Sequence, residues 1–410
     1  MRNERGIALV ITLLVVTLLT ITVIEFTYSV QIDMHMAHNA LNGLQASLLA
    51  RSGINVGEAL LLHDNDPLVD AYTEEWCPAH ASGGSHAACN FDAAASQLVV
   101  PENMRLRVQI VDESSKLNLN LTRPPNVNAW RAGKNPNPNQ SLPFQSWKAA
   151  LGQLLTGRGL DEKIADSVAD YWDRLYDAAY GQGTNPVGGT PGAGNPTPGR
   201  SGQTSQTPTP GAPNAQQQLL WDFPSLDDAS VVAGLTPNVL RRMRSVLTAL
   251  PFNRAAQVNV NTASREVLTA IIGDASAVDN IISQRDGDAI KPTDLNALLS
   301  NVSKDPNDPT GRNAHLMLGT RSVYFLIRAS ALVNPNPLTG KGGVARSASM
   351  LVRRDPRPGV APNAPPGTPR WTLTRLDWQK EGGAALFQQK ADQQPGADDL
   401  MNPDDFGMGG

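Results

Sequence analysis

The hydrophobic pattern of the chain opens with an uncharged apolar stretch behind a short polar leader. The leader ends in Arg5-Gly6, and the apolar stretch runs from Ile7 to Ile24. As a helix rising ~1.5 Å per residue, this stretch spans roughly 27 Å, enough to cross the hydrocarbon core of a bilayer. Arg2 and Arg5 precede it and Glu25 follows it. The pattern therefore predicts a membrane anchor with a cytoplasmic N-terminus, and an extracytoplasmic chain from about residue 30 onward.

The apolar pattern continues beyond this predicted span. Apolar residues recur as far as Leu60, and the first proline is Pro67. A secretory signal peptide has a shorter apolar region and a small-residue cleavage site behind it, and the sequence shows neither. We therefore expect one long helix. Its first half is apolar all round, and its second half is amphipathic and suited to pack on a globular domain.

Later segments alternate apolar and polar residues, which predicts half-buried strands. They cover 104–110, 323–333, 344–352 and 371–378. The predicted fold class is α+β, with the long N-terminal helix packed on an antiparallel sheet. A large insertion separates the first strand from the other three.

The insertion is predicted to be all-α and is organised by an internal repeat. Leu117-Asn118-Leu119-Asn120 is echoed by Val258-Asn259-Val260-Asn261, and each run precedes a helix, a glycine turn and a second helix. The turns contain Gly157 and Gly159 in the first copy and Gly273 in the second. Another helix is expected over 239–247. The two copies resemble SAM-like or helix-hairpin-helix units.

The charge of the two copies argues against nucleic-acid binding. The whole chain carries a formal net charge of -4, and the hairpin regions 151–180 and 255–300 each hold three basic and six acidic residues. Binding to phosphates depends on clustered cations that displace counterions. We therefore expect protein-contact or structural modules here and no nucleic-acid partner.

The chain has two cysteines, Cys77 and Cys89. Outside the cytoplasm a disulfide between them is the default expectation, and closing this small loop would stabilise the fold by about 3 kcal/mol. The pattern Cys77-x2-His80-x5-His86-x2-Cys89 also has the ligand types of a tetrahedral zinc site. Disulfide, zinc site and free thiols are the three states open to this pair.

The N-terminal region as a whole resembles the class III signal of type IV pilins and type II secretion pseudopilins. The resemblance rests on the polar leader, the glycine, the apolar half-helix and the amphipathic half-helix. It implies cleavage by a prepilin peptidase between Gly6 and Ile7. Such proteins generally carry a glutamate at the fifth residue after the cut, where this chain has Ile11. A carboxylate in hydrocarbon is costly unless a neighbouring amine neutralises it, so an apolar residue here suits a subunit at the end of a filament.

The combined motifs resemble the minor pseudopilins of the general secretion pathway protein K family. Besides the apolar start, they are 111–113 leading into 116–120, 223–226, 250–251, 258–263 and 321–354. The resemblance implies a pilin-like domain with a large helical insertion, capping the tip of the pseudopilus. It also implies I-type and J-type minor pseudopilins, the prepilin peptidase and an inner-membrane secretion platform as partners. The implied location is the inner membrane, with a single span and a periplasmic main domain.

These readings give the following expected organisation. The leader covers 1–6, and the membrane half of the helix covers 7–30. The amphipathic half and the first strand cover 31–112. The inserted α-helical domain covers 113–318, with a linker at 181–218, and is followed by the remaining strands at 319–380 and a disordered acidic tail at 381–410.

Two further expectations concern chemistry. The family tends to carry a carboxylate-rich calcium loop after Trp172, but only Asp170, Asp173 and Asp177 are nearby here, so calcium stays open and no cofactor is expected otherwise. The sequence contains no recognisable nucleophile with a base or paired catalytic carboxylates, so we expect no enzyme.

The alternative function is a membrane-tethered helix-hairpin-helix receptor for nucleic acid, of the competence type.

Overall fold

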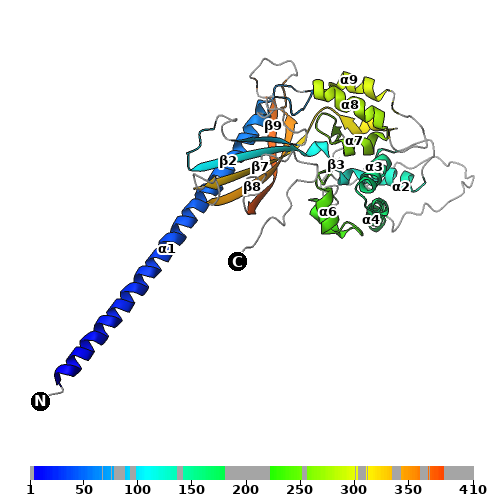
Figure 1. The fold of residues 1–410 in the computed structure, drawn as a ribbon. Helices are drawn as coiled ribbons and strands as arrows, with labels where there is room; N and C mark the ends of the chain where they lie inside the picture. Colours follow the sequence, from blue (N-terminus) through cyan, green and yellow to red (C-terminus); the bar gives the residue numbers. More distant parts are fainter. Residues whose placement is uncertain are drawn as a thin grey trace, which may run out of the picture.

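The structure is a computed structural model. It describes residues 4–66, 68–74, 76–77, 88–92, 98–135, 142–180, 222–251, 256–300, 302, 311, 313–334, 343–360, 368 and 370–382, with side chains from Leu9 to Asp377. A long helix carries a sheet near its C-terminal end, and a group of shorter helices lies beside that sheet, at the end of the molecule away from the N-terminus (Figure 1).

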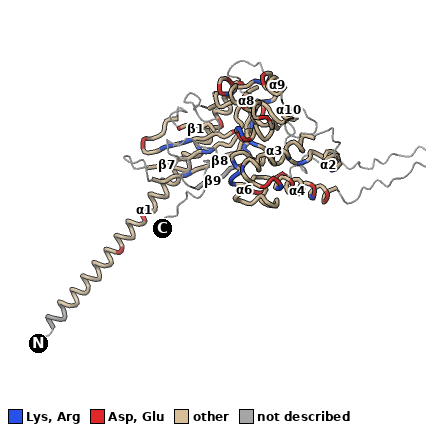
Figure 2. Tube along the Cα trace, turned by 45° about the vertical axis from the view of Figure 1, so that its right-hand side comes forward, with Lys and Arg blue, Asp and Glu red and all other residues tan. Residues whose placement is uncertain are grey.

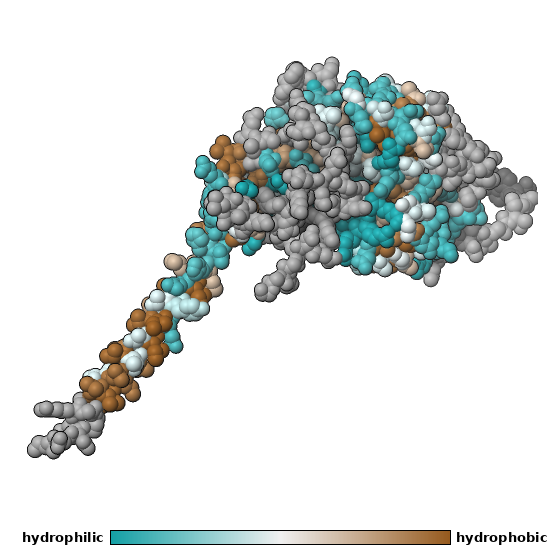
Figure 3. Space-filling view, in the orientation of Figure 1, coloured by the Kyte–Doolittle hydropathy of each residue, from teal (hydrophilic) through white to brown (hydrophobic). Residues whose placement is uncertain are grey.

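The long helix, α1, covers Glu4–His63. It contains no proline and ends four residues before Pro67, which cannot continue a helix. Leu9–His63 includes an 18-residue window with a mean hydropathy of 2.5, none of it buried in the molecule. Figure 3 shows α1 as a rod leaving the body, mostly brown and apolar toward its N-terminal end and more hydrophilic nearer the body. The predicted single long helix is confirmed.

The sheet packs on the C-terminal half of α1. Within the described residues it has five antiparallel strands in the order β1-β2-β7-β8-β9. Their bounds are β1 Cys89–Asp92, β2 Met104–Asp112, β7 Tyr324–Val333, β8 Val344–Pro356 and β9 Trp371–Gly382. β2 and β7 pair from Met104 opposite Val333 to Asp112 opposite Phe325, although the whole insertion separates them in sequence. The predicted α+β class with its antiparallel sheet is confirmed.

The sequence reading missed strand β1. Of its four residues, Cys89 and Phe91 face the core, whereas Asn90 and Asp92 are exposed. Four residues are too few for an alternating pattern to stand out. β1 is held in place by pairing with β2, with Cys89 opposite Ile110.

α1 approaches the sheet closely because glycines lie on its inner face. A Cβ added to Gly57 would lie 2.6 Å from the Cγ2 atom of Ile327, and one added to Gly53 would lie 2.7 Å from the Cβ atom of Ala329. Real Cβ atoms essentially never come this near a neighbour. The spacing between helix and sheet therefore depends on these glycines.

Replacing Gly57 by valine is expected to destabilise the folded chain by about 1–3 kcal/mol, because the new side chain would overlap Ile327 in a packed core. Urea denaturation of the detergent-solubilised chain, followed by tryptophan fluorescence, measures the change. Gly157→Ala is the matched control, since a Cβ there meets nothing within 4 Å. A Gly57→Val chain as stable as the control would contradict the close packing.

The insertion forms a second hydrophobic core, separate from the core between α1 and the sheet. Its longer elements are α2 Val127–Lys134, α3 Pro143–Gly157, α4 Lys163–Tyr180, α6 Pro237–Met243, α7 Arg265–Ile272, α8 Ala275–Gly287, α9 Pro292–Leu299 and α10 Ala314–Met317. Short parallel strand pairs join β3 Leu117–Asn118 to β4 Leu247–Thr248, and β5 Val258–Asn259 to β6 Leu318–Gly319. The helix expected over 239–247 was wrong at its end, because α6 ends at Met243 and Leu247 lies in β4, where it pairs with Leu117.

The two asparagine runs adopt the same local structure. The side-chain oxygen of Asn118 accepts the N–H of Asn120, and that of Asn259 accepts the N–H of Asn261. The amide of Asn120 bonds to both the N–H and the carbonyl of Phe223. Asn261 does the same with Ile290. Each copy thus uses its second asparagine to fix a later loop, which explains why the motif repeats.

Candidate assembly site

The N-terminal part of α1 is the first element of the candidate site. The backbone of Gly6 and Ile7 lies in α1, and their side chains lie outside the described ones. Ile11 is 56% exposed and points away from the rest of the chain. The threonines of this region donate their hydroxyls to carbonyls of their own helix, as Thr20 does to Val16 and Thr27 to Val23. This part of the helix therefore offers an apolar surface with its polar groups satisfied internally, as a bilayer requires.

The second element is a buried ionic cluster where α1 ends against the sheet. Arg354 of β8 is fully buried, and its guanidinium bonds to Asp64 at 2.7 Å and to Asp70. The guanidinium also lies over the rings of Phe325 and Trp371, at 4.8 and 4.3 Å from their centroids. Arg354 therefore ties together the end of α1, the loop that follows it and three strands of the sheet.

A second buried cluster joins the sheet to the inserted helices. Asp112 at the end of β2 accepts hydrogen bonds from Ser322, Thr262 and Asn259, and from the backbone N–H of Ser114. Burial raises the pKa of Asp112, and these donors oppose that shift. The first asparagine of the second repeat thus bonds outward to the sheet domain, whereas its counterpart in the first repeat bonds to a loop of its own unit.

These two clusters connect to each other. The Asp70 side chain accepts the N–H of Ser322, and the Asp70 carbonyl accepts from the Asn259 amide. These buried, directional hydrogen bonds therefore join the inserted helices to the sheet and to the end of α1.

Sequence reasoning did not single out Arg354, Asp112 or Asp64. For Arg354 and Asp112 the sequence did contain a clue. Alternate residues of a strand face the same side, so Arg354 faces the core together with Val352, and Asp112 together with Ile110. A charged residue at an inward position of an apolar strand needs a buried partner. The partner itself, far away in sequence, could not be read from the pattern.

Glu74 lies beside the ionic cluster and makes folding sensitive to pH. Burial raises its pKa to about 8, and the nearby Asp64 adds to the shift. Its Oε2 atom accepts the N–H of Ala71 at 2.8 Å and the indole N–H of Trp76 at 3.1 Å. A carboxyl group whose pKa is higher in the folded chain takes up a proton on folding, so stability is greatest at low pH and is lost as the pH rises.

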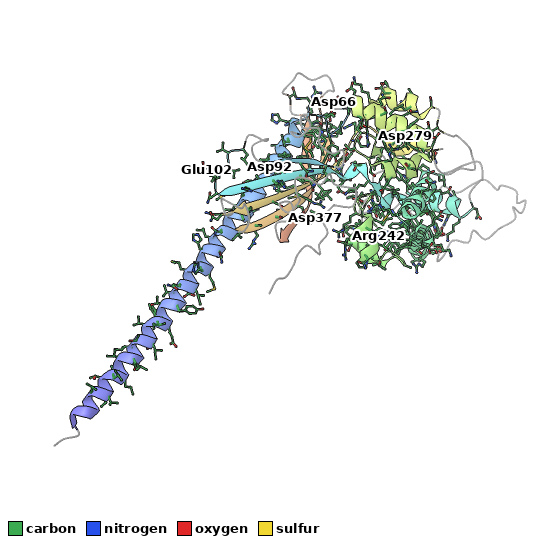
Figure 4. The ribbon with its side chains drawn as sticks, in the orientation of Figure 1. Asp66, Asp92, Glu102, Arg242, Asp279 and Asp377 are labelled. Carbon is green, nitrogen blue, oxygen red and sulfur yellow. A yellow bond between two sulfur atoms is a disulfide. The ribbon has the colours of Figure 1, made fainter. Side chains whose placement is uncertain are left out.

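We expect the free energy of unfolding to fall between about pH 4.5 and pH 8, by roughly 1 kcal/mol per pH unit for this one proton. Glu74→Gln should flatten that fall and be more stable than the original chain at pH 8, because the amide oxygen still accepts both hydrogen bonds without a charge. Urea denaturation across this pH range tests it. Glu102→Gln, at the exposed position labelled in Figure 4, serves as control and should leave the slope unchanged.

Both cysteines belong to the core between α1 and the sheet, and Cys89 is the first residue of β1. Cys77 and Cys89 form a disulfide, with their Cα atoms 5.5 Å apart. This is the first of the three states considered for the pair, and it leaves neither sulfur as a thiolate for zinc. His80 and His86 lie outside the described residues.

The carboxylates discussed for calcium have other partners. Asp173 accepts the indole N–H of Trp130 at 2.8 Å, and Asp177 pairs with Lys134 at 3.1 Å. The stretch after Tyr180 lies outside the described residues. Among the described carboxylates, those near enough to share a metal are Asp64, Asp70 and Glu74, but Asp64 and Asp70 already bond to the buried guanidinium of Arg354. A cation bound here would have to lie beside that positive charge, so this group does not fit a calcium ion.

Three of the six basic residues of the two hairpins, Arg158, Arg265 and Arg285, are engaged in contacts within the fold. The guanidinium of Arg285 is buried and donates to the carbonyls of Val260 and Ala263. Arg265 pairs with Asp279, and Arg158 pairs with Glu266 across the two units. Figure 2 shows Asp and Glu interspersed with Lys and Arg over the inserted helices, and in Figure 4 the exposed Arg242 and Asp279 lie on different units. No phosphate-binding surface is formed by these residues within the described part of the chain.

Comparison with solved structures shows what this chain is similar to. No family model matches the chain, and neither does any curated protein. A solved structure, the GspK-GspI-GspJ complex from the enterotoxigenic Escherichia coli Type 2 Secretion System, is similar at a TM-score of 0.47 and 15% sequence identity. The match covers 86% of this chain and 100% of the solved one.

Proposed function

We propose that this chain is a structural, non-enzymatic minor pseudopilin at the tip of a type II secretion pseudopilus. A prepilin peptidase would remove the leader between Gly6 and Ile7. The mature chain would stay in the inner membrane with its body in the periplasm, and would assemble with I-type and J-type minor pseudopilins on the inner-membrane platform. The fibre would drive export of folded proteins across the outer membrane.

The observation that carries the proposal is the form of α1. One unbroken helix, Glu4–His63, contains the predicted cleavage site, carries no carboxylate from Ile7 to Ile24, and packs with its C-terminal half on an antiparallel sheet. The mature N-terminus would therefore lie in the bilayer, and Ile11 would need no amine from a neighbour. A chain with no carboxylate at this position is suited to the end of a filament, where it has a neighbouring subunit on one side only.

The bulk of the insertion supports the tip position. Its helices lie beside the sheet at the end of the molecule away from the anchor (Figure 1), and the Arg354 and Asp112 clusters fix them there. A rigid body of this size would block stacking of another subunit above it. The competence-type alternative is not favoured, because Arg158, Arg265 and Arg285 are engaged within the fold.

Mass spectrometry of the chain purified from its own membranes tests the processing step. The expected mature N-terminus is Ile7, with or without an N-methyl group. A chain that still begins at Met1, or that is cut near residue 40, would overturn the proposal.

Immunogold labelling of isolated pseudopili tests the position separately. An epitope inserted in 201–204, which lies outside the described residues, should be found at one end of each fibre. Labels distributed along the shaft would contradict a tip subunit even if the N-terminus is correctly processed.

A further inference from the structure

Strand β9 forms one edge of the sheet. It covers Trp371–Gly382 and pairs with β8 along one of its sides. Within the described part of the chain no strand pairs with its other side, so a row of backbone N–H and C=O groups is open there. A long open edge of this kind is a template for another strand, and proteins usually cover it.

The pairing with β8 decides which residues of β9 direct their backbone groups at this open edge. The N–H of Arg354 donates to the carbonyl of Val323, on the β7 side, so even-numbered residues of β8 bond to β7 and odd-numbered ones to β9. Ser349 therefore bonds to Gln379, its partner in β9. The residues of β9 that alternate with Gln379 direct their N–H and C=O groups at the open edge instead. They are Trp378, Lys380 and Gly382.

A groove between α1 and β9 lies beside this edge. It has a volume of about 740 Å³, and its lining includes Leu48 of α1 and Met350, Leu376 and Asp377 of the sheet. Leu48 is 53% exposed, and Leu376, at an irregularity in the pairing of β9 with β8, is 40% exposed. An apolar side chain added at the sheet edge, on the side of α1, would remove apolar surface of this groove from water.

The chain continues from β9 into a segment whose sequence suits a hairpin. Residues 383–390 read Gly-Ala-Ala-Leu-Phe-Gln-Gln-Lys. Glycine at the first position of a two-residue turn is typical of a type II′ hairpin, and Gly383 is the first residue after β9. Gly382 and Ala385 would then bond to each other across the turn, as the open-edge direction of Gly382 requires. A turn one residue earlier would need Glu381 to bond there, but its backbone groups are directed at β8.

This turn fixes the register of the residues that follow it. Lys390, the only basic residue of 383–410, would lie directly opposite Asp377, and opposite charges in such a pair attract. Phe387 would lie opposite Lys380. Because Lys380 pairs with Ala348, a residue of the core between α1 and the sheet, Phe387 would fall on the side of α1, where the groove lies.

We propose that residues 385–390 form an additional antiparallel strand on the open edge of β9, with Phe387 covering the α1–β9 groove. The occupant is this chain's own C-terminal segment, because a turn of two residues brings it to the edge at a low cost in loop entropy. The strand closes the edge against pairing with a second copy. This inference goes beyond the proposed function and does not depend on it.

Disulfide trapping in the full-length, detergent-solubilised chain tests the register. Gln379 and Gln388 would face each other in a pair without mutual hydrogen bonds, which is the closer kind of antiparallel pair. Gln379→Cys with Gln388→Cys should form an intramolecular disulfide at least about tenfold faster than Gln379→Cys with Gln389→Cys, because residue 389 would point to the other face. Peptide mass spectrometry identifies the bond. Equal rates, or bonds only between two copies of the chain, would overturn the proposal.

Hydrogen exchange of single backbone amides gives a measurement that needs no added cysteine. In the full chain the amides of Trp378 and Lys380 should be protected. In a chain ending at Gly383 they should exchange at least about tenfold faster, whereas the amide of Gln379, which bonds to β8, should stay protected. A chain ending at Asn402 is the matched control and should behave as the full chain does. Fast exchange of Trp378 and Lys380 in the full chain would overturn the proposal.

A substitution pair tests the role given to Phe387. In the chain that carries cysteines at 379 and 388, Phe387→Asp should slow disulfide formation by about tenfold, because a charged side chain cannot cover the apolar groove. Phe406→Asp, in the same C-terminal segment but outside the proposed strand, should leave the rate unchanged. Equal rates in the two variants would contradict the placement of Phe387 at the groove.

Discussion

Gly6→Val is expected to abolish removal of the leader and, with it, assembly of the chain into a fibre. Glycine presents no side chain at the peptide bond to be cut, and a β-branched residue in its place would crowd the peptidase site. The uncut leader would leave Arg2 and Arg5 attached to the apolar helix and would block the N-terminus that the proposal places in the bilayer. The measurement is the mass of the chain from native membranes, together with secretion of folded substrates.

Two controls separate this effect from a general defect. Asn3→Val makes a comparable change inside the leader, three residues from the cut, and should be processed normally. Gly6→Ala adds a single methyl group and should be processed more slowly than the original chain but faster than Gly6→Val. An unprocessed Gly6→Val chain that still supports secretion would contradict the proposed function.

Arg354→Met is expected to lower the free energy of unfolding by about 3–5 kcal/mol, because it removes the partner of two buried carboxylates and leaves their charge uncompensated. Asp64 and Asp70 have side-chain exposures of 2% and 1%, so water cannot replace the guanidinium. Burial already raises the pKa of Asp64 to about 6, against the opposing attraction of Arg354. Without Arg354 that carboxyl should hold its proton to still higher pH, so the loss of stability should be largest at alkaline pH.

The neighbouring Arg353→Met is the matched control. Arg353 lies on the same strand but is 44% exposed at its side chain and pairs with Asp355 at the surface. Exposed ion pairs of this kind contribute at most about 1 kcal/mol. Urea denaturation of the two variants at pH 6 and pH 8 makes the comparison. Equal stabilities would show that the buried cluster does not hold the end of α1 on the sheet.

The residue pattern was sufficient for the elements that depend on local chemistry. α1 could be predicted because its apolar run is too long for a strand and contains no proline. The strands from Met104, Tyr324 and Val344 could be predicted because alternation marks one face for burial. The asparagine repeat was visible because each copy encodes the same turn, stabilised within a few residues of Asn118 and Asn259. The calcium question and the 381–410 tail concern residues that lie largely outside the described ones.

Other features depended on contacts between distant segments. Strand β1 and the two-residue strands β3 to β6 exist only because another part of the chain pairs with them, and Leu247 left its predicted helix for that reason. Arg354 meets Asp64 across 290 positions of sequence, and no local pattern specifies such a pair.

The sequence by itself determined the long, largely apolar N-terminal helix and the half-buried strands, because periodicity along one segment decides which of its faces avoids water. Only the tertiary structure decided which stripe of α1 the sheet covers and which it leaves open, and which buried charges share Arg354. These outcomes depend on how segments far apart in sequence pack against one another, and the free energy of that packing is not a property of any one segment.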